Sequence, residues 1–108
     1  LGKAIEGMLE ELLPVLDSFD AAFSGASWQN VDANWRTGIE YIHSQFKKIL
    51  DENNVKAFGA VGDTFDPTLH DVSEEVPSEQ AAGTVHKVLR TGYQLNGKVI
   101  RPARVQIA

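Results

Sequence analysis

The chain has 108 residues, of which 43% are hydrophobic and 23% charged, with a formal net charge of −5 and no cysteine. This length allows one ordinary domain or two small lobes with a modest core, and the composition argues against disordered, collagen-like and membrane-spanning proteins. The acidic balance argues against general nucleic-acid binding, and the lack of cysteine excludes disulfides and suits a reducing compartment. We therefore expect a cytoplasmic protein without membrane or nucleic-acid partners.

The first 23 residues are predicted to form an amphipathic helix. Because the helical pattern is already present at Leu1, we expect the chain to be a fragment whose upstream helix was removed. Apolar residues from Ile5 to Phe23 recur at intervals of three and four, which gives a helix one buried stripe. Pro14 lies inside this stripe, where it removes a backbone hydrogen bond, so we expect a kink or a break there.

A second helix is predicted from about Val31 to about Asn53, after a loop around Gly25, with Ser27 or Asn30 as its cap. Two amphipathic helices joined by a short loop form an antiparallel hairpin, and such a hairpin buries both stripes only in a bundle. We therefore expect a homodimer built on a four-helix bundle, with dimerisation through Leu12, Leu16, Phe19, Trp35, Ile39, Ile42 and Phe46. Gly38 in mid-helix indicates the close approach of another backbone, of this protein or of a partner.

Beyond Asn54 the residue pattern becomes that of short strands. Segments 55–58, 83–95 and 98–107 are rich in β-branched and aromatic residues, and Asn96-Gly97 between two apolar runs is typical of a type I′ hairpin turn. The stretch 62–83, with two prolines and many acidic residues, is predicted to be mainly loop. The expected fold is thus α+β, with a helical dimerisation region at 1–54 and a small β-rich head at 55–108.

The sequence offers little evidence for a catalytic, metal-binding or cofactor-binding site. His43, His70 and His86 are not in a metal-ligand spacing, and His70 after Asp66-Pro67 is expected to fix a loop through a local hydrogen bond. The acidic residues between 63 and 79 lack a calcium-binding frame, and the glycines form no nucleotide-binding motif, so we expect no metal, cofactor or catalytic site.

Charge is distributed unevenly along the chain. Residues 51–83 carry one basic and eight acidic side chains, whereas 84–108 carry five basic and none acidic. A basic surface on an acidic protein could be a solvated face, a nucleic-acid patch or a contact for an acidic protein, and the acidity elsewhere favours protein contact. Its residues are Lys87, Arg90, Lys98, Arg101 and Arg104.

Four segments, taken in order, resemble the GrpE family. They are Leu12–Ala22 (LLPVLDSFDAA), Gly38–Ile42 (GIEYI), Phe65–His70 (FDPTLH) and Gly92–Ala103 (GYQLNGKVIRPA). The resemblance implies a dimer with a long paired N-terminal helix, of which only the end is present here, a four-helix bundle and a β-rich head on each chain. It also implies a nucleotide exchange factor that binds the nucleotide-binding domain of a DnaK-type chaperone and promotes ADP release, without being an enzyme.

The same resemblance implies a set of partner-binding positions. Lys98 stands where arginine is common, which keeps the charge and loses the planar fork of the guanidinium. Gly38 matches a bundle glycine near which the chaperone docks, so the close approach at Gly38 is expected to be intermolecular. The full set is Gly38, Phe65, Pro67, Leu89, Lys98 and Ile107.

Two alternatives remain open. The chain could be a dimeric adaptor that binds another acidic protein through its basic hairpin. It could also be a small enzyme that uses His70 with Asp66 or Asp71.

Overall fold

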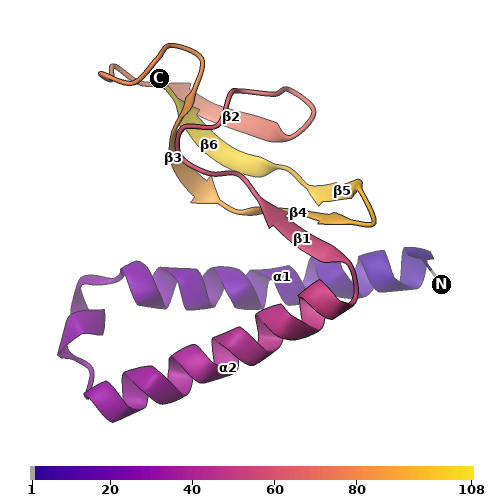
Figure 1. Cartoon of the computed structure of the whole chain (residues 1–108), viewed down its shortest axis with the longest axis vertical. Coiled ribbons are helices and arrows are strands. Elements are labelled where there is room, and N and C mark those ends of the chain that lie inside the picture. Colours follow the sequence, from indigo (N-terminus) through magenta and orange to yellow (C-terminus); the bar gives the residue numbers. More distant parts are fainter. Residues whose placement is uncertain (1) are drawn as a thin grey trace. The chain divides into compact units, whose positions relative to one another are not determined.

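The computed structural model describes residues 2–108. The chain divides into a helical unit that ends at Asn54 and a β-rich unit, Val55–Ala108. The helical unit contains α1 (Gly2–Ser24), the short 3₁₀ helix η1 (Ala26–Asn30) and α2 (Ala33–Glu52) (Figure 1). The β-rich unit, which we call the head, contains six strands, so the fold is α+β as predicted.

Helix α1 continues through Pro14 without interruption, so of the kink or break expected there the break is wrong. Both Pro14 and Glu10 are exposed, so the backbone hydrogen bond that proline removes lies on the solvent side, where water can replace it. Ser18 Oγ donates to the Pro14 carbonyl at 3.1 Å in the next turn. Leu9, Leu13 and Leu16 are buried at helical spacing, as the predicted stripe requires.

Helix α2 begins two residues later than predicted. Because the residues expected to cap it form η1, the N-cap is Asp32, whose side chain accepts the Asn34 N–H at 3.0 Å. The predicted caps Ser27 and Asn30 are therefore wrong. At the other end, Asn54 takes a left-handed conformation with φ 62°, the predicted stop for this helix.

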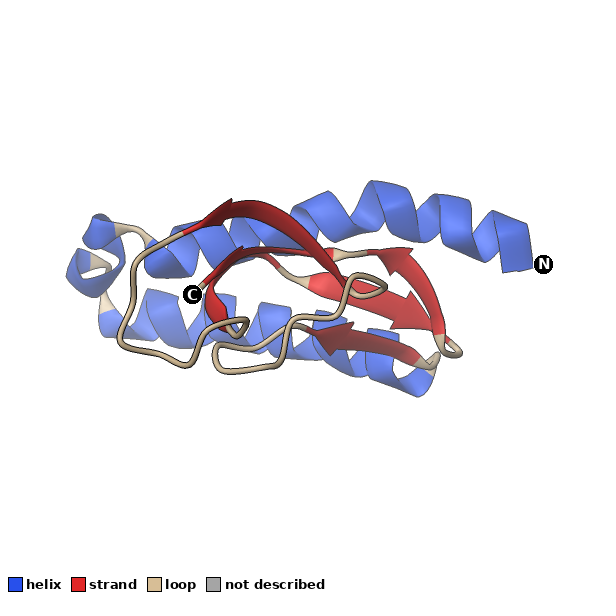
Figure 2. Ribbon diagram, turned by 90° about the horizontal axis from the view of Figure 1, so that it is seen from above, coloured by secondary structure: helices blue, strands red, loops and turns tan. Residues whose placement is uncertain are grey.

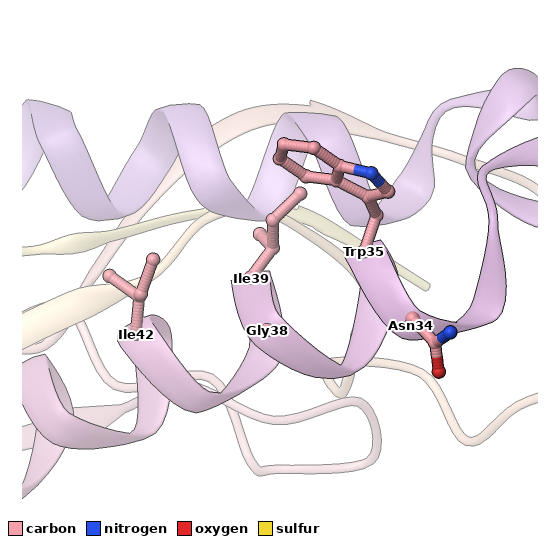
Figure 3. Close-up of a pocket in the computed structure, with 5 residues that line it drawn as sticks. All are labelled: Asn34, Trp35, Gly38, Ile39 and Ile42. Carbon is pink, nitrogen blue, oxygen red and sulfur yellow. The ribbon is translucent and has the colours of Figure 1, made fainter.

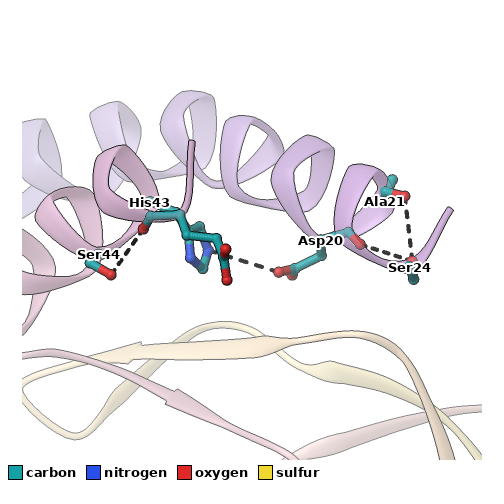
Figure 4. A network of polar contacts seen from close by, with 6 residues as sticks. Asp20, Ala21, Ser24, His43 and Ser44 are labelled. Atoms are coloured by element: carbon teal, nitrogen blue, oxygen red, sulfur yellow. Dashed lines mark hydrogen bonds and ion pairs between the residues drawn. The ribbon is translucent and has the colours of Figure 1, made fainter. Parts of the chain in front are cut away.

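Aromatic rings join the two helices at the end of the hairpin that carries η1. The His43 ring lies edge-on to Phe23 with centroids 5.0 Å apart, and Phe23 meets Trp28 of η1 at 4.9 Å. His43 Nε2 also lies 3.9 Å from Asp20 Oδ1 (Figure 4). This cluster holds α1 and α2 as the antiparallel hairpin that the sequence predicts.

The head consists of two three-stranded sheets. One is antiparallel with the order β1-β4-β5, made of Val55–Phe58, Gly92–Leu95 and Lys98–Arg101. The other has the order β2-β6-β3, made of His70–Glu75, Ala103–Ile107 and Val85–Arg90, with β2 parallel to β6 and β3 antiparallel to it. Long loops connect β1 to β2 and β2 to β3 (Figure 2).

Strand β2 lies in the stretch 62–83, which the sequence predicts to be mainly loop. The strand has one apolar residue, Val72, among polar and charged ones. Charged side chains are common on edge strands, and β2 is an edge that pairs only with β6. Its pairing depends on a partner 33 residues away, such as Ala103 opposite His70, which no local pattern reveals.

The core of the head is small. Val85, Ala103 and Val105 are fully buried, and Phe58 of β1, Val72, Val88 and Ile107 pack against them. The predicted turn joins β4 to β5, with φ 49° at Asn96 and 83° at Gly97, the two positive values of a type I′ turn. None of the helices within residues 2–108 is both long and apolar enough to cross a membrane.

Candidate functional site

The loop that leads into β2 forms a tight turn around Asp66. One oxygen of the Asp66 carboxylate, Oδ1, accepts the Thr68 hydroxyl at 2.6 Å and the Thr68 N–H at 2.8 Å. These two hydrogen bonds lower the pKa of Asp66 below its ordinary value, the hydroxyl bond most strongly, while burial acts in the opposite direction. The carboxylate therefore stabilises the turn that presents Pro67.

Two expected contact residues lie in this turn. Phe65 is half-buried and its ring stacks on His70, with centroids 6.0 Å apart and an angle of 29° between the planes. Pro67 is exposed. The expectation that His70 fixes the loop is confirmed, because its Nδ1 accepts the Asp66 N–H at 2.9 Å.

The other contact residues predicted in the head are on separate strands. Leu89 is exposed on β3, and Ile107 near the end of β6 is half-buried against the core cluster. In the register of the two strands Ile107 lies opposite Val85, at the other end of β3 from Leu89. Lys98 is in the other sheet, exposed directly after the Asn96-Gly97 turn. The head thus presents these positions on a loop, a sheet and a hairpin.

The structure divides the basic residues of the C-terminal quarter into two groups. Arg101 has a structural role, because its Nε donates to the Thr91 carbonyl at 2.9 Å and its guanidinium carbon lies 5.3 Å from the centre of the Tyr93 ring. The exposed group is Lys87, Arg90, Lys98 and Arg104.

A second candidate surface lies on α2, within the helical unit. An open hollow of about 320 Å³ is lined by Asn34, Trp35, Gly38, Ile39 and Ile42, and the side chains of Trp35, Ile39 and Ile42 point the same way (Figure 3). Trp35 is 70% exposed and Ile42 54% exposed. A Cβ added to Gly38 would meet nothing within 4 Å. This face of α2 is therefore apolar and solvent-exposed, and no side chain fills its centre at Gly38.

Several of the residues expected at the dimer interface are not solvent-exposed on this chain. Leu16 is buried, and Leu12, Phe19, Ile39 and Phe46 are half-buried. Asn34 was not predicted as a site residue, although its position four residues before Gly38 places both on one face of the helix. Ile49, which the sequence places on the apolar face of this helix, is 60% exposed.

The geometry does not support the pairing of His70 with the Asp66 carboxylate that one form of the enzyme alternative requires. The hydrogen bond to the His70 ring comes from the backbone of Asp66, and the Asp66 carboxylate is directed to Thr68. Within residues 2–108, no three His, Asp or Glu side chains come together in an arrangement that could hold a metal ion.

Comparison with known proteins places this chain in a family. The sequence profile of the GrpE family matches residues 2–108. The chain is 43% identical over 105 residues to proteins named "Protein GrpE" from Burkholderia mallei (strain SAVP1), Burkholderia pseudomallei (strain K96243) and Burkholderia cenocepacia (strain J2315). These matches cover 97% of the chain and 56% to 57% of each relative, so the chain spans just over half the length of the curated relatives it matches. By the extent of the profile match and the identity over nearly its whole length, the chain belongs to the GrpE family.

Proposed function

We propose that the protein is a nucleotide exchange factor that binds the nucleotide-binding domain of a DnaK-type chaperone and promotes the release of ADP. Exchange by docking needs no reacting group and no cofactor. It requires only that the factor bind the open state of the nucleotide cleft more tightly than the closed state, because a ligand shifts an equilibrium by its differential affinity.

The observation that carries this proposal is the environment of Gly38. Glycine in the middle of a helix costs about 1 kcal/mol relative to alanine. Among the described residues, no atom outside the glycine's own stretch of helix lies within 4 Å of the position that a Cβ would take, so the missing side chain serves no packing there. A glycine kept on an open apolar face is suited to the close approach of a backbone from another molecule.

The head supplies the second part of the proposed contact. Phe65 and Pro67 are two apolar residues of a turn stabilised by Asp66, Leu89 is exposed on β3, and Lys98 directly follows the hairpin turn. Apolar anchors surrounded by charged residues are typical of protein interfaces. We include Ile107 in the contact through its position near the end of β6.

We further propose that the protein acts as a homodimer whose helical hairpins form a four-helix bundle. This is supported by the exposed apolar side chains of Trp35 and Ile42 on α2 and of Ile5, Met8 and Val15 on α1. Such a concentration of exposed apolar side chains on a helical hairpin is characteristic of an interface.

The test is the rate at which fluorescent ADP leaves a DnaK-type chaperone, measured by stopped flow with and without the full-length protein. We expect acceleration that saturates with protein concentration and is weakened by substitutions at Gly38 and in the turn 65–67. If the protein bound the chaperone without accelerating release, the adaptor alternative would replace the exchange factor. Absence of both binding and acceleration would overturn the proposal.

A further inference from the structure

His70 is the buried polar side chain of the part of the chain that the structure describes, with 7% of its surface exposed. It is the first residue of β2 and lies opposite Ala103 of β6. Burying a polar group is costly unless it makes hydrogen bonds, so the contacts of the imidazole show why it is tolerated at this position.

His70 is hydrogen-bonded to Asp66 twice, once through its ring and once through its backbone. His70 Nδ1 accepts the Asp66 N–H at 2.9 Å, and the backbone N–H of His70 donates to the Asp66 carbonyl at 2.9 Å. A ring nitrogen that accepts a hydrogen bond carries no proton, so the imidazole is neutral with its hydrogen on Nε2. The bond at Nδ1 therefore depends on one tautomer of one charge state.

The backbone on either side of this turn is fastened elsewhere. The Phe65 N–H donates to the Gly83 carbonyl at 2.9 Å, and the Leu69 carbonyl accepts the Ala103 N–H at 2.9 Å. Between these two anchors, the N–H of Asp66 has its partner in the imidazole. The same ring stacks on Phe65, so a single side chain contacts both the backbone and the apolar side chain of the turn.

We propose that His70 is a positioning residue for partner binding, which sets the orientation of Phe65 and Pro67 through the acceptor at Nδ1. This inference rests on the proposed function, because the partner is the nucleotide-binding domain of the chaperone. The chemistry that Phe65 and Pro67 fit is an apolar patch on that domain. His70 does not touch the patch, since it is buried behind the turn.

A matched pair of substitutions separates the acceptor from the bulk of the side chain. Asparagine places Oδ1 the same number of bonds from the backbone as Nδ1, whereas leucine has the same branched shape without an acceptor. His70→Asn therefore keeps the bond to the Asp66 N–H, and His70→Leu leaves that N–H without a partner. Both remove the ring that stacks on Phe65.

The experiment uses the full-length protein and the chaperone nucleotide-binding domain, with affinity measured by calorimetry. We expect His70→Leu to weaken binding about tenfold, as for the loss of one buried hydrogen bond. His70→Asn should bind within a few fold of the unchanged protein. In parallel, amide hydrogen exchange should show the Asp66 N–H protected in the unchanged protein and in His70→Asn, and unprotected in His70→Leu.

Pro67→Ala provides the control, since it removes an exposed contact without touching the hydrogen bond. It should weaken binding while the Asp66 N–H stays protected. Equal affinity of His70→Asn and His70→Leu would overturn the inference, as would a ¹⁵N spectrum showing the His70 proton on Nδ1. If the unchanged protein did not bind the chaperone while the Asp66 N–H behaved as expected, the proposed function would fail and the role of His70 in partner binding would fail with it.

Discussion

The ring of Phe58 occupies the space that a side chain on Gly92 would need. A Cβ at Gly92 would come within 2.5 Å of Phe58 Cζ and 2.7 Å of the Ala103 backbone nitrogen. Phe58 and Gly92 face each other across the β1–β4 pair, and Phe58 packs on the core cluster that includes Ala103. The absence of a side chain at Gly92 thus lets the first sheet pack against the core of the second.

Gly92→Ala is therefore expected to lower the free energy of unfolding of the head by about 1–3 kcal/mol, the usual cost of overpacking. Urea unfolding followed through the amide signals of β1 and β4 measures it. Gly7→Ala is the control, because nothing lies within 4 Å of its Cβ and alanine favours a helix. An unchanged urea midpoint in Gly92→Ala would show that the Phe58 ring moves aside without loss of stability.

The stability of the turn around Asp66 is predicted to depend on pH, because it relies on the ionised Asp66 carboxylate. Its folded-state pKa lies below the ordinary value of 3.8, chiefly because of the hydrogen bonds from Thr68. The stability that this carboxylate contributes is therefore fully present above pH 3.8 and is lost as the pH falls through the folded-state pKa. A ¹³C titration of Asp66 should give a value below 3.8, and in Thr68→Val the value should move back toward it. A value unchanged by Thr68→Val would contradict the assigned cause.

Gly38→Asp tests the proposed docking face of α2. The helical circular dichroism should stay close to that of the unchanged protein, because the substituted position points into open space. Affinity for the chaperone nucleotide-binding domain should fall by at least about tenfold, because a charge would be buried where a backbone must approach. Gly38→Ala is the matched control, expected to stabilise the helix by about 0.5–1 kcal/mol. Parallel loss of helicity and binding in Gly38→Asp would instead make the glycine a packing residue.

Substitutions that disrupt the proposed dimer should lower the mass of the protein in solution without changing its fold. Trp35→Ala combined with Ile42→Ser should shift the full-length protein toward a monomer in sedimentation velocity, while head signals in the NMR spectrum stay in place. Tyr41→Ala is the control, since Tyr41 is 64% exposed and is not among the residues predicted to dimerise. If the double variant sedimented as the unchanged protein does, Trp35 and Ile42 would not hold the dimer together.

Much of the fold was predictable where the controlling interactions are local. The periodicity of α1, the left-handed stop at Asn54 and the strand Val55–Phe58 follow from neighbouring residues, as does the turn at Asn96-Gly97. The bond between His70 and the loop was predictable for the same reason, because its partner is four residues away. The cap at Asp32 was missed, because η1 takes up residues that could equally have begun the helix.

The sequence by itself determined an α+β chain of the GrpE type, because helix periods, turn residues and family motifs are all recorded in short segments. Only the tertiary structure decided that the polar segment His70–Glu75 is a strand, since its pairing with β6 spans more than thirty residues. It also decided that Arg101 supports the hairpin through Tyr93 and Thr91, and that the space around Gly38 is empty. These properties depend on which atoms meet across the folded chain, and residue order alone does not specify those distances.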